Sequence, residues 1–183
     1  MDNLKTNFGK RKVSTKLKTK LVQDIFTNVA SNYDLMNDIM SFGSHRLWKK
    51  ELIDLMNIQK NETIVDIGSG TGDLINLILN LKKNNSIYAV DLNSEMLQYS
   101  KKRHTNKNVT FIKANAEKLP FNNNSIDKYI ISFCLRNVSD IDNVLRESYR
   151  ILKPGGVFYC LEFSSPESSF IKNLYNQYKK NII

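Results

Sequence analysis

The stretch "VDIGSGTGDL" from Val65 to Leu74 decides the fold. The β-branched residues at its beginning predict a buried strand over Thr63–Ile67, and the residues at its end predict a helix over Gly72–Leu81. Between the two, three closely spaced glycines let the chain turn sharply and let a ligand approach backbone atoms that a Cβ would shield. These glycines are Gly68, Gly70 and Gly72. A strand, a glycine loop and a helix in this order indicate a ligand site at the carboxyl edge of a sheet.

Outward from this stretch, short β-branched runs alternate with helical patterns. The predicted strands are Ile87–Val90, Val109–Lys113, Lys128–Ser132 and Val157–Phe163, and the predicted helices are Ser94–Lys102 and Ile141–Leu152. Nearly continuous apolar strands favour a parallel sheet covered on both faces, so we expect a doubly wound α/β domain of three layers. Two helices, Leu17–Val29 and Ser44–Met56, are expected before the first strand. We therefore divide the chain into an N-terminal part, 1–58, and a ligand-binding domain, 59–183.

Asp91 is the second element of the expected site. It ends a predicted strand about 20 residues after the glycine loop, which is the offset of a carboxylate that accepts hydrogen bonds from both hydroxyls of a ribose. A dinucleotide would also use such a pair, but its fingerprint needs a small residue where this chain has Asp73, and no Lys-Ser/Thr pair follows the glycines as in a phosphate-binding loop. S-adenosylmethionine has no phosphate and carries a cationic amino group, so it is compatible with Asp66 and Asp73.

A third element follows the next strand in "KANAEKLPF". Asn115 and Ala116 stand at its carboxyl end, where ligands of open α/β sheets collect, and their polar groups could bind the edge of an adenine. Two plainer interpretations stay open, namely an ordinary turn at Asn115 and glycines that only tighten the turn before a helix.

Composition sets wider limits. Lys and Arg outnumber Asp and Glu by 27 to 18, a net charge of +9, which suits nucleic acid, an anionic membrane surface or no specific partner. Much of the excess lies in the first twenty residues, which we expect to form a solvated basic arm. No apolar run approaches the ~18 residues that cross a bilayer, and no secretory signal is evident, so an intracellular protein is expected. Cys134 and Cys160 are expected to be buried free thiols, and no metal is implied.

Seven strings of the sequence together resemble one family. They are "NYDLMNDIMSFGSHRLWK", "VDIGSGTGDL", "AVDLNSEML", "ANAEKLPF", "ISFCLRNVSD", "RILKPGG" and "LEFSSP". The family that they resemble is the ubiquinone/menaquinone biosynthesis C-methyltransferases of the UbiE type. The glycine loop and "LKPGG" are shared by many methyltransferases, whereas the string before the sheet and "RNV" at Arg136 to Val138 are specific to this group. The resemblance implies a Rossmann-like class I methyltransferase fold.

The resemblance also implies a reaction and its cofactor site. The family transfers a methyl group from S-adenosylmethionine, without a metal, to a ring carbon of a polyprenyl benzoquinol, 2-methoxy-6-polyprenyl-1,4-benzoquinol, or of demethylmenaquinol. Residue by residue it implies cofactor contacts from Thr71, Asp91, Asn115, Ala116 and Ser132. With Asp66 and the three glycines, these complete the expected cofactor site.

The reaction also needs an acceptor for the quinol proton and a donor or cation for the developing oxyanion. Arg136 and Asn137 follow the fourth strand and are candidates for holding the quinol oxygen. Tyr33 and His45 lie in the segment before the sheet, which we expect to fold over the substrate as a lid, and His45 has an unperturbed pKa suited to a base. Structural roles stay open for these residues: an arginine paired with a carboxylate, an asparagine in a turn and a histidine at a helix start.

Two departures from the family matter. Cys134 stands where the family usually has Gly, and the chain stops at Ile183, short of the family's last strands. We therefore expect an incomplete sheet, and either poor stability or a partner over the exposed edge, such as a second copy.

Rival functions are methylation of another small molecule or of RNA, although nucleic acid is not favoured, or an inactive cofactor-binding module. The expected location is the cytoplasm, or the mitochondrial matrix in a eukaryote, with peripheral association with the inner membrane or a quinone-biosynthesis complex.

Overall fold

The computed structural model describes residues 5–8, 11–29, 33–41 and 43–163. Its main sheet has five strands, all parallel, in the order β5-β4-β3-β6-β7. The strands are β3 (Thr63–Ile67), β4 (Ser86–Asp91), β5 (Val109–Lys113), β6 (Ile126–Ser132) and β7 (Leu152–Leu161). Because the order reverses at β3, the carboxyl ends of β3, β4 and β6 surround one point at the edge of the sheet, which is the usual place for a ligand.

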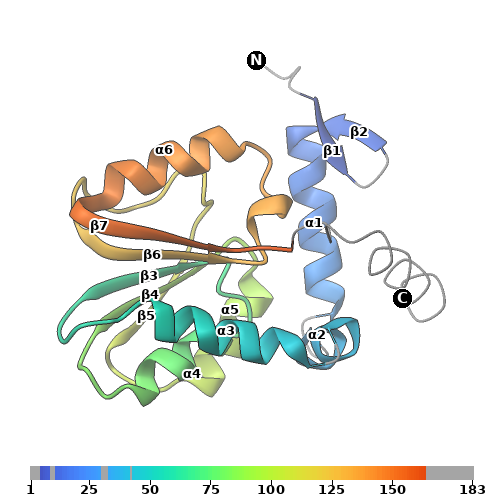
Figure 1. Cartoon of the computed structure of the whole chain (residues 1–183). Helices are drawn as coiled ribbons and strands as arrows, with labels where there is room; N and C mark the ends of the chain where they lie inside the picture. The colour runs from blue at the N-terminus through green and yellow to red at the C-terminus, as the bar shows by residue number, and fades with distance from the viewer. Residues whose placement is uncertain (1–4, 9–10, 30–32, 42, 164–183) are drawn as a thin grey trace, which may run out of the picture.

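Helices cover both faces of this sheet, as Figure 1 shows. The helices that follow the strands are α4 (Asp73–Asn80), α5 (Ser94–Arg103) and α6 (Ile141–Ile151). Alternate residues of β3 divide between two cores: Ile64 packs with residues of α4, and Val65 packs with Val144 of α6. The three-layer α/β architecture expected from the sequence is therefore confirmed.

The expected element boundaries agree closely with the structure. Thr63–Ile67 and Val109–Lys113 are strands with the expected bounds, and the other strands and helices of the sheet domain lie where they were expected. The largest difference is β7, which begins at Leu152 rather than Val157 because Leu152 already pairs with Ile126 before a shift in register. Among the described strands, β7 and β5 form the two edges of the sheet.

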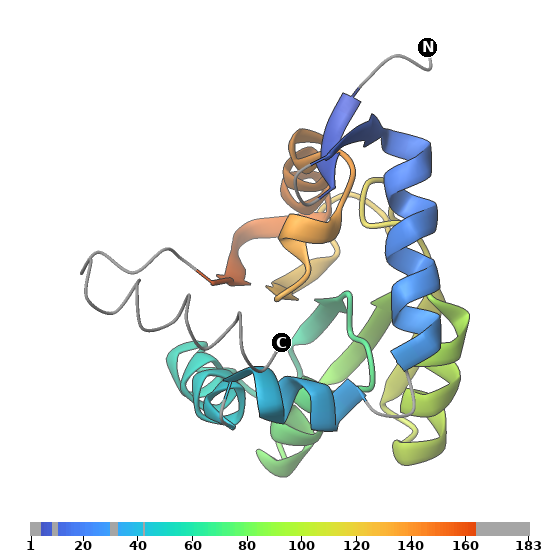
Figure 2. The ribbon, with the colours of Figure 1, turned by 90° about the vertical axis from the view of Figure 1, so that its right-hand side faces the viewer.

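The N-terminal part begins beside the carboxyl edge of the sheet, where its first helix lies (Figure 2), and ends with a helix that packs on one face of the sheet. It contains an antiparallel hairpin of β1 (Lys5–Phe8) and β2 (Arg11–Ser14), followed by the helices α1, α2 and α3. Their bounds are α1 (Thr15–Val29), α2 (Tyr33–Ser41) and α3 (Ser44–Leu55). The basic residues of this segment are exposed, as expected, with the exception of Lys18, which is 7% exposed; the described ones are Lys5, Arg11, Lys12, Lys16 and Lys20. The hairpin and the start of α1 were not expected in the arm.

The two cysteines are free, as expected, but Cys160 is exposed. Burial was expected from its apolar neighbours, yet Cys160 lies on β7, an edge strand of the described sheet, where one flank has no described neighbour. Cys134 is partly buried, and burial raises the pKa of its thiol well above the ordinary value. In the described residues, no helix combines the length and apolarity that a membrane span requires.

Candidate functional site

The glycine loop connects β3 to α4 with all three glycines in the left-handed region, at φ values of +67° for Gly68, +53° for Gly70 and +88° for Gly72. The N–H of Gly68 donates to the carbonyl of Val90 at 2.8 Å, which ties the loop to β4. A Cβ on Gly68 would meet the side chain of Cys134, and one on Gly72 would lie 2.6 Å from Nε2 of His104. The first and third glycines are therefore required by the protein's own packing as well as by the turn.

Asp91 lies beside this loop at the end of β4. Its Oδ2 accepts the N–H of Gly70 at 2.9 Å, and its Oδ1 accepts the N–H of Asn93 at 2.8 Å. Burial raises the pKa of Asp91, while the backbone donors act in the opposite direction. The carboxylate is thus held in a fixed orientation, and each oxygen keeps capacity to accept a further hydrogen bond.

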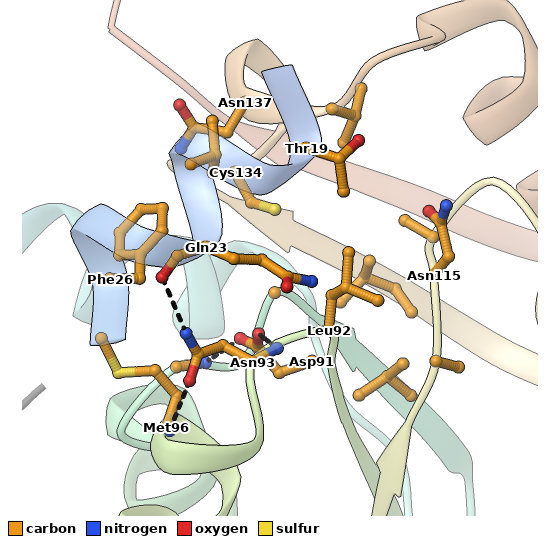
Figure 3. A pocket seen from close by; sticks show the side chains of 18 of the residues that line it. Thr19, Gln23, Phe26, Asp91, Leu92, Asn93, Met96, Asn115, Cys134 and Asn137 are labelled. Carbon is orange, nitrogen blue, oxygen red and sulfur yellow. Dashed lines mark hydrogen bonds between the residues drawn. The ribbon is translucent and has the colours of Figure 1, made fainter. Parts of the chain in front are cut away.

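Asn93 joins the end of β4 to α1, as the dashed lines in Figure 3 mark. Its Oδ1 caps α5 by accepting the N–H groups of Glu95 and Met96. Its Nδ2 donates to the carbonyl of Gln23 at 3.2 Å and to Oγ1 of Thr27 at 2.9 Å. Sequence reasoning missed Asn93, although an asparagine directly before a predicted helix is a recognised capping signal.

A cavity lies between α1 and the carboxyl edge of the sheet. It brings together residues from the glycine loop, from the ends of β4, β5 and β6, and from α1, whose Gln23 extends toward Leu92 in Figure 3. The residues in its lining that the sequence predicted are Gly68, Gly70, Asp91, Asn115, Ala116, Ser132 and Asn137. Four residues of α1 that the sequence did not single out also line it, namely Thr19, Val22, Gln23 and Phe26.

A smaller, polar chamber adjoins this cavity and shares Gly68, Gly70, Ser132 and Phe133 with it. Two further predicted residues, Asp66 and Thr71, line the chamber. Asp66 is 2% exposed, burial raises its pKa to about 7, and in the described structure neither its Oδ2 nor Oγ of Ser132 has a hydrogen-bond partner. Buried polar atoms without partners are costly and suit a ligand that supplies them. A nucleoside with a cationic amino acid tail fits the cavity and the chamber together.

Arg136 and Asn137 belong to a short 3₁₀ helix, η2 (Leu135–Asn137), that follows β6. Asn137 lines the cavity, but Arg136 does not. The Arg136 guanidinium forms an ion pair with Glu162 and lies over the ring of Phe163, 5.0 Å from its centroid. Glu162 was not a predicted site residue, and it lies far from Arg136 in sequence.

Phe133 stands where the cavity and the chamber meet. Its backbone φ is +54°, a conformation that is uncommon outside glycine and that often marks a functional position. Its ring stacks on Phe163 with centroids 4.7 Å apart, and Trp48 of α3 packs against both rings. An aromatic wall therefore adjoins Arg136 at the carboxyl end of β6.

Among the other predicted residues, His45 and Gly72 lie outside the lining of the cavity and of the chamber. His45 is 3% exposed in α3, and its Nε2 lies 2.8 Å from Oδ1 of Asp38 in α2, outside the lining of both cavities. Hydrogen bonds from Arg46, and next from His45, lower the pKa of Asp38. Tyr33 begins α2, but its side chain lies outside the described residues. The described residues contain no cluster of His, Cys, Asp and Glu that could hold a metal ion.

Comparisons with known proteins agree with this geometry. The model of the ubiE/COQ5 methyltransferase family matches residues 14–183. The ubiquinone/menaquinone biosynthesis C-methyltransferase UbiE of Rickettsia bellii is 46% identical, over 97% of this chain and 75% of the relative. The mitochondrial 2-methoxy-6-polyprenyl-1,4-benzoquinol methylase of Dictyostelium discoideum is 40% identical, over 100% of this chain and 68% of the relative.

A solved structure shares the fold. The SAM-dependent methyltransferase of Aquifex aeolicus superposes with a TM-score of 0.58 at 23% identity, over 66% of each chain. The family match spans most of the chain, and the two relatives agree with it over nearly all of the sequence. The chain therefore belongs to the ubiE/COQ5 methyltransferase family and is a methyltransferase whose cofactor is S-adenosylmethionine.

Proposed function

We propose that the protein transfers a methyl group from S-adenosylmethionine to a ring carbon of a polyprenyl benzoquinol, or of demethylmenaquinol, in ubiquinone or menaquinone biosynthesis. The observation that carries the proposal is the cavity that extends from Asp91 to Asn137 under α1, because it joins a nucleoside site to a second polar group at the end of β6. The relatives' names supply the substrate class.

Each part of the cofactor has candidate partners in the two cavities. Asp91 accepts hydrogen bonds from the ribose hydroxyls, Asn115 and Ala116 contact the adenine, and Asp66 faces the amino group. Gly68, Gly70, Thr71 and Ser132 form the surface between them, and Gly72 supports this surface through the turn before α4. When bound, S-adenosylmethionine supplies an electrophilic methyl group on a sulfonium.

Arg136 and Asn137 are the proposed catalytic residues. A quinol ring carbon becomes nucleophilic when a neighbouring hydroxyl loses its proton, so a cation near that oxygen lowers the barrier. Glu162 orients the Arg136 guanidinium through their ion pair, and the rings of Phe133 and Phe163 offer an apolar surface for the quinol ring. The ring of His45 is held by Asp38, which favours a role in positioning α2 against α3 over a role as the base.

Residues 1–58 act as a lid in this proposal. The helix α1 covers the cavity and is fastened near both of its ends: Lys18 donates to the carbonyls of Arg136 and Val138, and Asn93 donates to Thr27. In this proposal α1 covers one side of the bound cofactor, and movement of α1 opens that side for exchange. The covering helix also keeps water from that side of the site, which strengthens the electrostatic contacts beneath it.

The membrane is the proposed location of the acceptor. A polyprenyl tail partitions into lipid, and the excess of basic residues favours an anionic surface. We therefore propose peripheral association with the membrane that holds the quinol, the inner membrane in bacteria or mitochondria. Flotation with anionic liposomes should recover the protein at low salt and lose it at high salt, and an absence of salt-dependent binding contradicts the proposal.

One assay tests the proposed reaction. Labelled methyl from S-adenosylmethionine should appear on a ring carbon of a short-chain demethylated benzoquinol, or of a short-chain demethylmenaquinol. The oxidised quinones are the matched controls and should not be methylated, because a quinone lacks the hydroxyl whose deprotonation activates the ring. Absence of transfer to both quinols, with cofactor binding intact, would overturn the substrate assignment.

A further inference from the structure

Lys49 is a buried cation on the inner face of α3. Its side chain is 10% exposed, and buried lysines are rare unless they are paired. Its Nζ donates to Oδ2 of Asp73 at 2.9 Å and lies 6.0 Å from the centroid of the Phe133 ring. An ammonium carries three donors, and Asp73 takes one of them. The ammonium of Lys49 therefore has donors left for a further acceptor.

Asp73 is not paired with Lys49 alone, because a second cation also lies near its carboxylate. Nη1 of Arg103 lies 3.9 Å from Oδ1 of Asp73, while Lys49 binds Oδ2. Lys49 and Arg103 lower the pKa of Asp73 against the effect of burial, so this carboxylate is ionised and shared between two cations. Lys49 thus shares the carboxylate of Asp73 with Arg103 and keeps donors for a further acceptor.

The chamber also contains groups suited to a cation. Asp66 lies on the floor of the same chamber, with Oδ2 unpartnered in the described structure, and Oγ of Ser69 and Oγ of Ser132 are unpartnered as well. A cation on one wall and a free carboxyl oxygen on another are complementary to a zwitterion, which carries one carboxylate and one ammonium. The chamber is continuous in its lining with the nucleoside cavity through Gly68, Gly70, Ser132 and Phe133.

We propose that Lys49 binds the carboxylate of the methionine part of S-adenosylmethionine and so positions the sulfonium relative to the nucleoside cavity. This rests on the cofactor of the proposed function. The ammonium of the same amino acid faces Asp66, so the two charges of the ligand meet two opposite charges of the chain. Lys49 is a binding residue here, and Asp73 and Phe133 orient its ammonium.

The alternative is a lysine that only holds Asp73 at the start of α4. The two roles differ in their dependence on the ligand. Three nucleosides separate them: S-adenosylhomocysteine, S-adenosyl-3-thiopropylamine, which lacks only the carboxylate, and 5′-methylthioadenosine, which lacks the whole amino acid. A binding role for Lys49 appears only with the first of these, whereas a role in the fold affects all three.

The test is calorimetric titration of the full chain and two variants with these nucleosides. Lys49→Met should weaken binding of S-adenosylhomocysteine about 10- to 100-fold, the range for a lost hydrogen bond to a charged group, and should leave the other two within about twofold. Lys50→Met is the matched control, since Lys50 is the adjacent lysine, exposed and paired with Asp54, and it should change none of the three. Lys49→Arg should keep much of the preference for the carboxylate.

Each failure has its own pattern. If the unaltered chain binds none of the three nucleosides, the cofactor site fails and this inference fails with it. If the unaltered chain binds S-adenosylhomocysteine and Lys49→Met binds it equally well, only the assignment of Lys49 is overturned. Equal weakening of all three nucleosides by Lys49→Met would assign Lys49 to the fold and would also overturn the inference.

Discussion

The backbone N–H of Gly70 donates a 2.9 Å hydrogen bond to Oδ2 of Asp91, which joins the glycine loop directly to the end of the neighbouring strand. The second oxygen of Asp91 accepts the N–H of Asn93 at 2.8 Å. Each carboxylate oxygen of Asp91 therefore accepts one backbone N–H of the protein itself. A residue at this position needs two acceptor atoms even when no ligand is bound.

Asp91→Asn should weaken binding of S-adenosylhomocysteine by at least tenfold. An amide has only one acceptor oxygen, so its NH₂ group would face the backbone N–H of either Gly70 or Asn93, and two donors would oppose each other. The negative charge that accepts the ribose hydroxyls would also be lost. Calorimetric titration measures the affinity, and thermal unfolding checks that the fold persists. An unchanged affinity would show that Asp91 serves the loop and not the ligand.

Gly68→Ala should destabilise the protein by more than the cost of its backbone conformation alone. The left-handed conformation costs about 1–2 kcal/mol for an alanine, and the contact of its Cβ with Cys134 adds about 1–3 kcal/mol of overpacking. Gly155→Ala is the matched control, because Gly155 has φ +81° and no atom within 4 Å of the added Cβ. Urea unfolding of both variants separates the two costs.

The variant Cys134→Gly completes this test. In its background Gly68→Ala should cost about 1–3 kcal/mol less, because the atoms that the new Cβ meets are gone while the backbone cost stays. Equal costs in both backgrounds would mean that the thiol side chain moves aside freely. The two variants together measure how far the side chain of Cys134 limits the space beside Gly68.

Local signals were sufficient for the sheet and for much of the cavity. The runs Thr63–Ile67 and Val109–Lys113 are short, rich in β-branched residues and each preceded by a polar residue, so this local pattern was enough to predict their bounds. Asp91 and Asn115 could be predicted to lie close together because the carboxyl ends of parallel strands meet at one edge of the sheet, whereas Ser132 was predicted from the family resemblance.

Other parts depend on partners far away in the sequence. Lys18 looks like one more residue of a basic run, and only the carbonyls of Arg136 and Val138, more than a hundred residues later, make its burial favourable. Lys49 likewise could not be recognised as a site residue from sequence, because only the packing of α3 places it beside Asp66 and Asp73. Cys160 has apolar neighbours in sequence, but its exposure is decided by the position of β7 at the edge of the described sheet.

Binding of the cofactor should depend on pH through Asp66. Burial raises its pKa to about 7, so the carboxyl takes up a proton as the pH falls below that value and loses its attraction for a ligand ammonium. The affinity for S-adenosylhomocysteine should fall about tenfold from pH 8 to pH 6. Asp66→Asn should bind more weakly at pH 8 and show no such slope. The same slope in both proteins would assign the titration to another group.

Arg136→Ala should bind S-adenosylhomocysteine normally and lose turnover by about 100-fold or more, the usual effect of removing a group that stabilises a developing oxyanion. Arg136 does not line the cofactor cavity, so the two readouts should separate. Glu162→Gln should lower turnover less, because it releases the guanidinium without removing it. Labelled methyl transfer measures the rate, and full turnover in Arg136→Ala would remove this residue from the mechanism.

Lys18→Met should loosen the lid. The Nζ of Lys18 donates to the carbonyls of Arg136 at 3.2 Å and Val138 at 2.7 Å, and its loss leaves these acceptors without their charged donor. The amides of α1 should then exchange with solvent about 10- to 100-fold faster, and dissociation of S-adenosylhomocysteine should accelerate with them. Lys20→Met is the control, since Lys20 lies two residues further on the same helix and is exposed. If exchange accelerates in α1 while ligand dissociation does not, α1 does not control exit from the cavity, and the cofactor leaves by a route that Lys18 does not close.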